Sequence, residues 1–237
     1  MVVHVLDTWK LDTLSKIYDL FDGVVETFAV ACKAGCDTCC TCNVTATGLE
    51  TAYVFSQLEK THIDAVTAKI ENEVGSNRYR PALTTNGFAR AAMSGDVVAE
   101  EENDPAWGRC PLLVDGRCSI YPVRPFGCRS MMSNRSCQEV GWAQMTPLAL
   151  TISTVILQYI EHLDDGGFFG NFLDMVGWFG THGESGQLSF DTLKASKMKA
   201  WALPNNKIPA LMVPPEHRSD VAPLIRALND LIRTDTR

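Results

Sequence analysis

Apolar residues recur every three or four positions in the first part of the chain, a spacing that gathers them on one face of an α-helix. This stripe predicts an amphipathic helix from Asp7 to about Ala31, with a weak point at Gly23 because glycine is a poor helix former. Its members are Leu11, Leu14, Ile17, Tyr18, Phe21, Val24, Val25 and Phe28. The predicted helix leads directly into a run of cysteines.

A second helix is predicted after that run. Thr47 and Glu50 have the spacing of a capping box, in which two side chains satisfy the free amides at a helix start. Helical spacing of apolar residues then continues until Gly75. The first cysteine run is therefore expected on a loop between two helices.

Most of the remaining chain is also predicted to be helical. Thr146 and Pro147 start a buried helix that ends at residues 164–167, and four prolines make residues 203–215 irregular. The acidic stretch 101–105 is expected to be a solvated loop. Further helices are predicted over 81–93, 168–179 and 190–201, and in a last segment capped by Ser219.

One pair of strands is predicted, in the segment CPLLVDGRCSIYPVRPFGC. Its Asp115-Gly116 pair lies between two apolar runs, which is typical of a two-residue hairpin turn. Such a turn places Val114 opposite Arg117 and Leu113 opposite Cys118. The expected fold is mainly α, with helices around a loop-rich cysteine metal site and one short β-hairpin. We divide it into a cysteine-cluster domain, 1–145, and a helical C-terminal segment packed on it, 146–237.

Charge and hydropathy exclude some classes of partner. The chain has 21 basic and 28 acidic residues and a formal charge of -7, without a basic tract that could neutralise phosphates, so nucleic acid is not an expected partner. Its most apolar stretch, Pro147 to Ile160, is too short and too polar for a membrane span. The chain start lacks the features of a secretory signal, and we expect a cytoplasmic protein.

Nine cysteines are the unusual feature of this composition. An odd count in a chain of this length, without an export signal, favours thiolates in a reducing compartment over disulfides. Their clustering is typical of metal sites, because soft thiolates bind zinc and iron tightly when several converge. The candidate ligands are Cys32, Cys36, Cys39, Cys40, Cys110, Cys118 and Cys128. The isolated Cys42 and Cys137 are interpreted as small core residues, and the five scattered histidines are not expected to be ligands.

The spacing leaves the number of metals open. Side chains of adjacent residues usually diverge, so Cys39 and Cys40 suit two metals, or one ligand and one neighbouring thiol. An ideal hairpin places Cys110 and Cys118 on opposite faces, so either Cys110 lies beyond the ribbon and turns back, or the two serve different metals. Arg124 and Arg129 are candidates to offset thiolate charge or to hold an anionic group of a bound molecule.

The run CKAGCDTCC, followed by CPLLVDGRCSIYPVRPFGCR, resembles the CxxCxxCC cysteine-cluster family, which is described as a zinc- or iron-chelating domain. The first gap departs from the family pattern, because three residues separate Cys32 from Cys36 where the name implies two. The resemblance implies metal binding, most simply a four-iron (4Fe-4S) iron-sulfur cluster. One branch is similar to the flagellin lysine methylase, which uses S-adenosylmethionine. The spacing of Cys32, Cys36 and Cys39 is also similar to the three-cysteine pattern of radical S-adenosylmethionine enzymes, whose cluster leaves one iron open for the cosubstrate. The chain shows neither the alternating strands and helices of a barrel nor a glycine-rich nucleotide-binding turn.

Three functions follow from these patterns. The first is an iron-sulfur protein whose cluster is held by four of the seven candidate cysteines. The second is a zinc-stapled, non-catalytic binding module. The third is an enzyme similar to a protein-lysine methyltransferase, with a small-molecule cosubstrate and a protein substrate. The patterns do not decide whether the chain is an enzyme.

Overall fold

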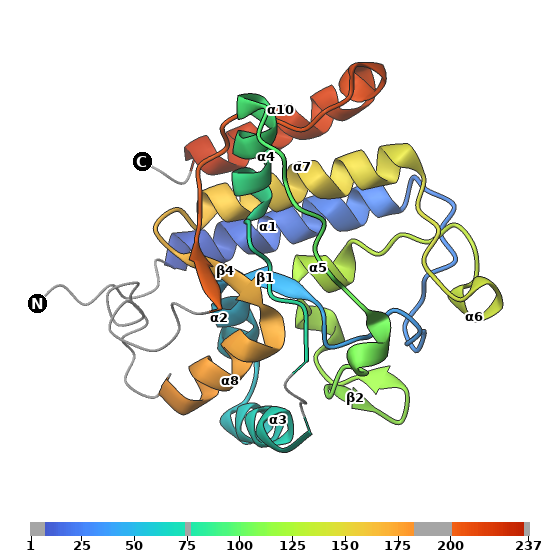
Figure 1. Cartoon of the computed structure of the whole chain (residues 1–237), viewed down its shortest axis with the longest axis vertical. Helices are drawn as coiled ribbons and strands as arrows, with labels where there is room; N and C mark the ends of the chain where they lie inside the picture. The colour runs from blue at the N-terminus through green and yellow to red at the C-terminus, as the bar shows by residue number, and fades with distance from the viewer. Residues whose placement is uncertain (1–7, 74–76, 183–200, 235–237) are drawn as a thin grey trace, which may run out of the picture.

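A computed structural model of the chain describes residues 8–73, 77–182 and 201–234 (Figure 1). It is mainly helical, as predicted, with a small antiparallel sheet and a cysteine-rich loop region. The helices are α1 (Thr8–Val25), α2 (Gly48–Gln57), α3 (Lys60–Glu73), α4 (Thr85–Ser94), α5 (Phe126–Arg129), α6 (Cys137–Val140), α7 (Pro147–Leu163), α8 (Phe172–His182) and α10 (Arg218–Thr234). Short 3-10 turns cover Pro105–Trp107, Tyr121–Val123 and Pro215–His217.

The predicted hairpin is confirmed. Strands β2 (Leu113–Val114) and β3 (Arg117–Cys118) pair antiparallel, with Leu113 opposite Cys118 and Val114 opposite Arg117. Both turn residues have positive φ, +50° at Asp115 and +73° at Gly116. A turn with both residues in the left-handed region matches the right-handed twist of the strands. This requirement explains why an Asp-Gly sequence occupies the turn.

The expectation that the hairpin holds the only strands is wrong. A second sheet has the order β1-β4-β5, from β1 (Thr45–Thr47), β4 (Phe168–Asn171) and β5 (Ala202–Pro204). The predicted helix over 168–179 therefore begins as strand β4 and becomes helical only from Phe172. All four residues of β4 are buried. The segment therefore lacks the alternation of apolar and polar residues that marks a half-exposed strand. Without it, a short apolar run fits a buried helix equally well.

Helix boundaries differ from prediction at several places, and α4 begins at Thr85 instead of Pro81. The pattern predicted up to Gly75 is two helices, because Leu58 is extended (φ -106°, ψ 143°) and separates α2 from α3. Helix α1 ends at Val25 instead of Ala31. Ser219 lies inside α10, which begins at Arg218 directly after a 3-10 turn, so its predicted role as the cap is wrong. The helix predicted over 190–201 falls outside the described residues, apart from Trp201.

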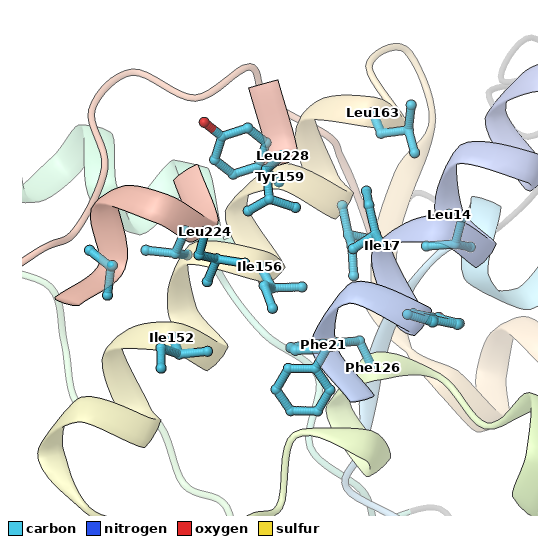
Figure 2. Packing of buried hydrophobic residues seen from close by; sticks show 14 of the residues in the cluster. Leu14, Ile17, Phe21, Phe126, Ile152, Ile156, Tyr159, Leu163, Leu224 and Leu228 are labelled. Carbon is cyan, nitrogen blue, oxygen red and sulfur yellow. The ribbon is translucent and has the colours of Figure 1, made fainter. Parts of the chain in front are cut away.

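Two hydrophobic clusters form the core. The first lies between α1, α7 and α10 and also takes in Phe126 from α5, whose ring packs edge-on against Phe21 with centroids 4.7 Å apart (Figure 2). The second lies among α2, α3, α8 and β4, and includes Leu112 and Ile120 from the hairpin region. Both clusters draw residues from before and after residue 146, so the two parts of the chain share their cores.

Glu50 connects the first core to the cysteine-rich region. Thr47 and Glu50 form the predicted capping box of α2. The Glu50 carboxylate, 1% exposed, also accepts hydrogen bonds from the amide of Phe126 (2.7 Å) and the hydroxyl of Tyr18 (3.1 Å). Burial raises the pKa of this carboxyl, and the hydrogen bonds oppose the shift. These bonds fix α5, which carries Cys128, against α1 and α2.

Within the described ranges, no helix has both the length and the apolar character needed to cross a membrane.

Candidate metal centre

Four separate segments carry the cysteines to one side of the molecule. The first run, 32–40, lies on the loop between α1 and β1. Cys110 lies just before the hairpin, and Cys118 lies in its second strand, β3. Cys128 lies in α5 and Cys137 begins α6. In Figure 1 the hairpin and α6 lie at the lower right, away from the C-terminal helix α10.

Eight thiols line a single cavity of about 200 Å³. All nine cysteines of the chain are free thiols. The cavity brings together the seven predicted candidates and adds Cys137. The eight are Cys32, Cys36, Cys39, Cys40, Cys110, Cys118, Cys128 and Cys137. Apolar side chains complete the wall, among them Phe21, Val44, Leu112, Ile120, Met132, Phe172 and Leu173.

The beginning of the first run is attached to the loop before α6. The amide of Ala31 donates to the carbonyl of Ser133 (2.7 Å). The Cys32 thiol donates to the carbonyl of Met131 (2.8 Å), and the amide of Ser133 donates to the Cys32 sulfur (3.2 Å). Gly35 at φ +87° and a bond from the Cys36 amide to the carbonyl of Lys33 (3.1 Å) make a turn that accommodates the three-residue gap. Cys32 thus faces the same cavity despite its unusual spacing.

The end of the first run is attached to the hairpin segment. The amide of Cys110 donates to the carbonyl of Cys40 (3.0 Å), and Thr41 pairs with Arg109 in an isolated antiparallel bridge. Cys110 lies before β2, outside the regular ribbon, and lines the same cavity as Cys118. Cys110 therefore lies beyond the ribbon and turns back to the same cavity, as the first of the two alternatives for this pair requires.

Cys39 and Cys40 lie next to each other in the cavity wall. The neighbouring Cys40 thiol is the largest cause of a raised pKa at Cys39, followed by burial. Both sulfurs belong to the cavity wall. The adjacent residues Cys39 and Cys40 therefore contribute two thiols to the same part of the cavity wall.

Burial in the cavity wall opposes the ionisation of four of its thiols in the absence of a metal. Burial raises the pKa of Cys32, Cys118 and Cys128, and that of Cys110 to about 11. A metal ion displaces such protons on binding, because the thiolate and not the thiol is the ligand. The chemistry of the site therefore suits a soft cation bound with release of protons.

The two predicted arginines have different surroundings. The charge of Arg124 lowers the pKa of Cys39, Cys118 and Cys128, against the stronger effects that raise them. Its guanidinium lies 3.8 Å from the centre of the Tyr121 ring and donates to the Tyr121 carbonyl (2.7 Å). This position is suited to offsetting thiolate charge.

Arg129 also lines the cavity, but its guanidinium bonds to other groups. It pairs with Asp22 of α1 (2.9 Å), donates to the carbonyl of Pro122 (2.9 Å) and lies 4.5 Å from the centre of the Tyr18 ring. These contacts hold α5 against α1, so Arg129 is better placed to position Cys128 than to bind a ligand.

The thiols surround the cavity without converging on one point. Among the described residues, no three Cys, His, Asp or Glu side chains are arranged to hold a single metal ion. A tetrahedral zinc site with Zn–S bonds of about 2.3 Å places its sulfurs about 3.8 Å apart. The donor set fits a thiolate-bound metal by its chemistry.

The two isolated cysteines have different positions. Cys42, 4% exposed, is part of the second hydrophobic core and donates to the Asn43 side chain (3.4 Å), in keeping with its interpretation as a core residue. Cys137 is equally buried at 3%, but it lines the cavity, which the sequence interpretation missed. Its neighbours Arg135, Ser136, Gln138 and Glu139 are polar. That context is unusual for an apolar core thiol and is the signal that could have identified it.

Comparison with known proteins agrees with this geometry. Residues 31–146 match the model of the CxxCxxCC family, described as "Putative zinc- or iron-chelating domain". Searches of curated proteins and of solved structures returned no match. The matched segment contains all eight cysteines of the cavity wall. Residues 31–146 of this chain are therefore similar to the CxxCxxCC family of cysteine-cluster domains.

Proposed function

We propose that the chain is an iron-sulfur protein in which cysteine thiolates of the cavity hold a four-iron cluster. One observation carries the proposal: eight thiols line a cavity of about 200 Å³, and no three of them, in the described residues, close around a single point. Four thiolates are the usual ligands of such a cluster. The candidates are four of the seven cysteines at positions 32, 36, 39, 40, 110, 118 and 128.

A zinc ion and a four-iron cluster differ in the space they require between their sulfur ligands. A single zinc ion requires four sulfurs in mutual contact. A four-iron cluster carries its thiolates on the corners of a larger body, so its ligands surround a cavity. The dispersed thiols favour the cluster, and a zinc-stapled module is the second candidate because it uses the same ligand chemistry.

Charge and polarity around the cavity support the same group. Arg124 contributes a positive charge near three of the thiols. The Ser133 amide donates to the Cys32 sulfur, the kind of bond that stabilises cluster thiolates. The apolar wall limits water, which protects a reactive cluster and tunes its potential. Nine free thiols also favour a reducing compartment such as the cytoplasm.

The cavity volume bears on S-adenosylmethionine. Pockets for drug-sized ligands have volumes of about 300–1,000 Å³. The cavity, at about 200 Å³, is below that range even before a cluster is placed in it. An inorganic group is therefore the occupant we propose, and lysine methylation draws no support from this volume.

Metal analysis of the anaerobically purified full chain tests the proposal. We expect iron and acid-labile sulfide in nearly equal amounts, with a broad visible absorption that bleaches on reduction. Colourless protein with zinc in whole-number stoichiometry would contradict the iron-sulfur assignment and favour the zinc-stapled module. Protein without tightly bound metal would contradict both.

Single substitutions test the ligand assignment. Cys39→Ser or Cys118→Ser should lower the metal content per chain at least twofold, because a serine hydroxyl is a poor ligand for soft metals. Cys42→Ser is the matched control, since Cys42 is buried but lies outside the cavity wall. Equal metal loss in all three variants would refute the assignment.

A further inference from the structure

The first cysteine run is fixed at its two ends by two different segments. Its start, at Cys32, bonds to Met131 and Ser133, which lead into α6. Its end, at Cys40, bonds to Cys110, which leads into the hairpin. The run therefore extends along the cavity from the α6 side to the hairpin side, and its thiols are divided between the two.

The positions of the other thiols show the same division. Cys137 begins α6, close in the chain to Ser133. Cys118 lies opposite Leu113 in the hairpin, and the amide of Leu113 donates to the carbonyl of Cys110 (3.3 Å). Cys128 lies in α5, which follows the hairpin. The adjacent Cys39 and Cys40 line the same cavity.

The loop before α6 is built to hold Cys137 in this place. Ser133, fully buried, donates from its hydroxyl to the carbonyl of Arg135 (2.7 Å) and accepts from the amide of Gln144 (3.0 Å). The amide of Asn134 donates to the carbonyl of Gln144 (2.9 Å). These bonds close the segment 133–144 on itself, with Cys137 directed to the cavity that Cys32 also lines.

We infer that the cavity holds two metal centres, one bound by Cys32, Cys36 and Cys137 and the other by Cys110, Cys118 and Cys128, with one sulfur of the adjacent Cys39–Cys40 pair completing each. Eight thiols make two sets of four, the number that a four-iron cluster takes. The inference rests on the proposed function, that these thiols bind metal. It adds Cys137 as a ligand and gives the adjacent pair a role.

Substitutions on the two sides of the cavity test the inference. Full-length Cys137→Ser and Cys128→Ser are purified anaerobically, analysed for iron, zinc and sulfide, and examined by Mössbauer spectroscopy after growth on ⁵⁷Fe. We expect each variant to lose at least one metal per chain and to keep the centre on the opposite side. The double variant Cys32→Ser/Cys137→Ser should lose no more metal than Cys137→Ser alone, because both residues serve one centre.

Cys42→Ser again is the control, because Cys42 is as buried as Cys137 and should keep the full metal content. Full metal content in Cys137→Ser, or loss of the same single signal in Cys137→Ser and Cys128→Ser, would overturn the two-centre inference and leave the proposed function intact. Wild-type protein that binds no metal would overturn both.

A measurement without substitution covers the case in which Cys137→Ser disturbs the folding of α6. Anomalous diffraction from crystals of the wild-type protein at the iron and zinc absorption edges locates each metal directly. Two separate peaks in the cavity, one next to Cys137, are expected. A single peak that Cys137 does not contact would overturn the inference.

Discussion

Among single residues, Glu50 has the largest number of structural roles next to the metal centre. Its carboxylate caps α2 through Thr47 and accepts from the backbone of α5 and the hydroxyl of Tyr18 in α1. A buried carboxylate is tolerated only when hydrogen bonds replace its hydration. The four bonds it accepts, two from Thr47 and one each from Phe126 and Tyr18, meet that requirement.

Glu50→Ala should therefore destabilise the protein strongly. It leaves the Phe126 amide and the Tyr18 hydroxyl without an acceptor in the interior, and each such loss costs about 1–3 kcal/mol. We expect the free energy of unfolding in urea to fall by about 3 kcal/mol. Glu71→Ala, on the exposed surface of α3, is the control and should change it by less than about 0.5 kcal/mol. A similar, small effect of both substitutions would show that the Glu50 bonds contribute little.

Asp164 gives a pH dependence of stability. Burial raises the pKa of this carboxyl to about 7, although it accepts from the Leu49 amide (3.1 Å) and the Asn205 side chain (2.8 Å). Between about pH 4 and pH 7 the folded protein keeps a proton that the unfolded chain releases. Stability should therefore fall as pH rises through this window, by up to about 4 kcal/mol for three pKa units.

Asp164→Asn tests this dependence because an amide does not titrate. Urea unfolding of the wild type and the variant at pH 5 and pH 7.5 should give a smaller decrease for the variant. The difference between the two proteins isolates Asp164 from Glu50 and Glu161, whose pKa values burial also raises. Parallel decreases in both proteins would exclude Asp164 as a source of the pH dependence.

At the residue scale, the sequence predicts where the cysteine cavity lies better than it predicts which cysteines line it. The seven candidate cysteines all line the cavity, because their clustering and the family motif depend on local spacing alone. Cys137 was missed because its proximity to Cys32 depends on the fold of a loop about a hundred positions away.

At the scale of elements, the contact between α5 and β1 positions Cys128. A Cβ atom on Gly127 would lie 2.9 Å from the backbone oxygen of Thr45 in β1. Only glycine lets these two elements approach this closely, because a backbone oxygen cannot move aside as a flexible side chain can.

Gly127→Ala should displace α5 and with it Cys128. We expect lower stability by about 1–3 kcal/mol, as for overpacked sites, and a lower metal content per chain. Gly23→Ala is the matched control, since a Cβ there has no neighbour within 4 Å. In the last turn of α1 that change should instead stabilise the protein by at most about 0.5 kcal/mol, measured by urea unfolding. Full metal content in Gly127→Ala would show that the α5–β1 distance does not control Cys128.

Elements differ in how far local sequence determines them. The hairpin was predictable to the register because the Asp-Gly turn fixes its pairing. The sheet β1-β4-β5 was not, because β1 and β5 have three residues each and gain their pairing only from the distant β4. The break at Leu58 was missed because the apolar periodicity continues through it.

At the scale of the whole molecule, the cavity wall and the first core share, in the described part of the chain, only Phe21 and Met132 among the buried residues of that core. The first core joins α1, α7 and α10, which are 17 or 18 residues long and bury aliphatic side chains against one another. The cavity is walled mainly by loops, the hairpin and two four-residue helices. Hydrophobic burial therefore stabilises the helices, whereas the loops that carry the thiols depend on bonds such as those at Cys32 and Cys110.

This separation predicts the effect of removing the metal. Anaerobic treatment of the loaded full chain with a strong chelator should leave the far-ultraviolet circular dichroism of the helices nearly unchanged, because α1, α7 and α10 keep their buried contacts. Limited proteolysis followed by mass spectrometry should then show new cleavage within 32–40 and 110–137, where the thiols lose their shared ligand. A zinc-stapled module behaves differently, because its metal supplies the folding free energy and chelation unfolds it as a whole. Loss of the helical signal on chelation would therefore favour the zinc-stapled module and contradict a helical core that is stable without metal.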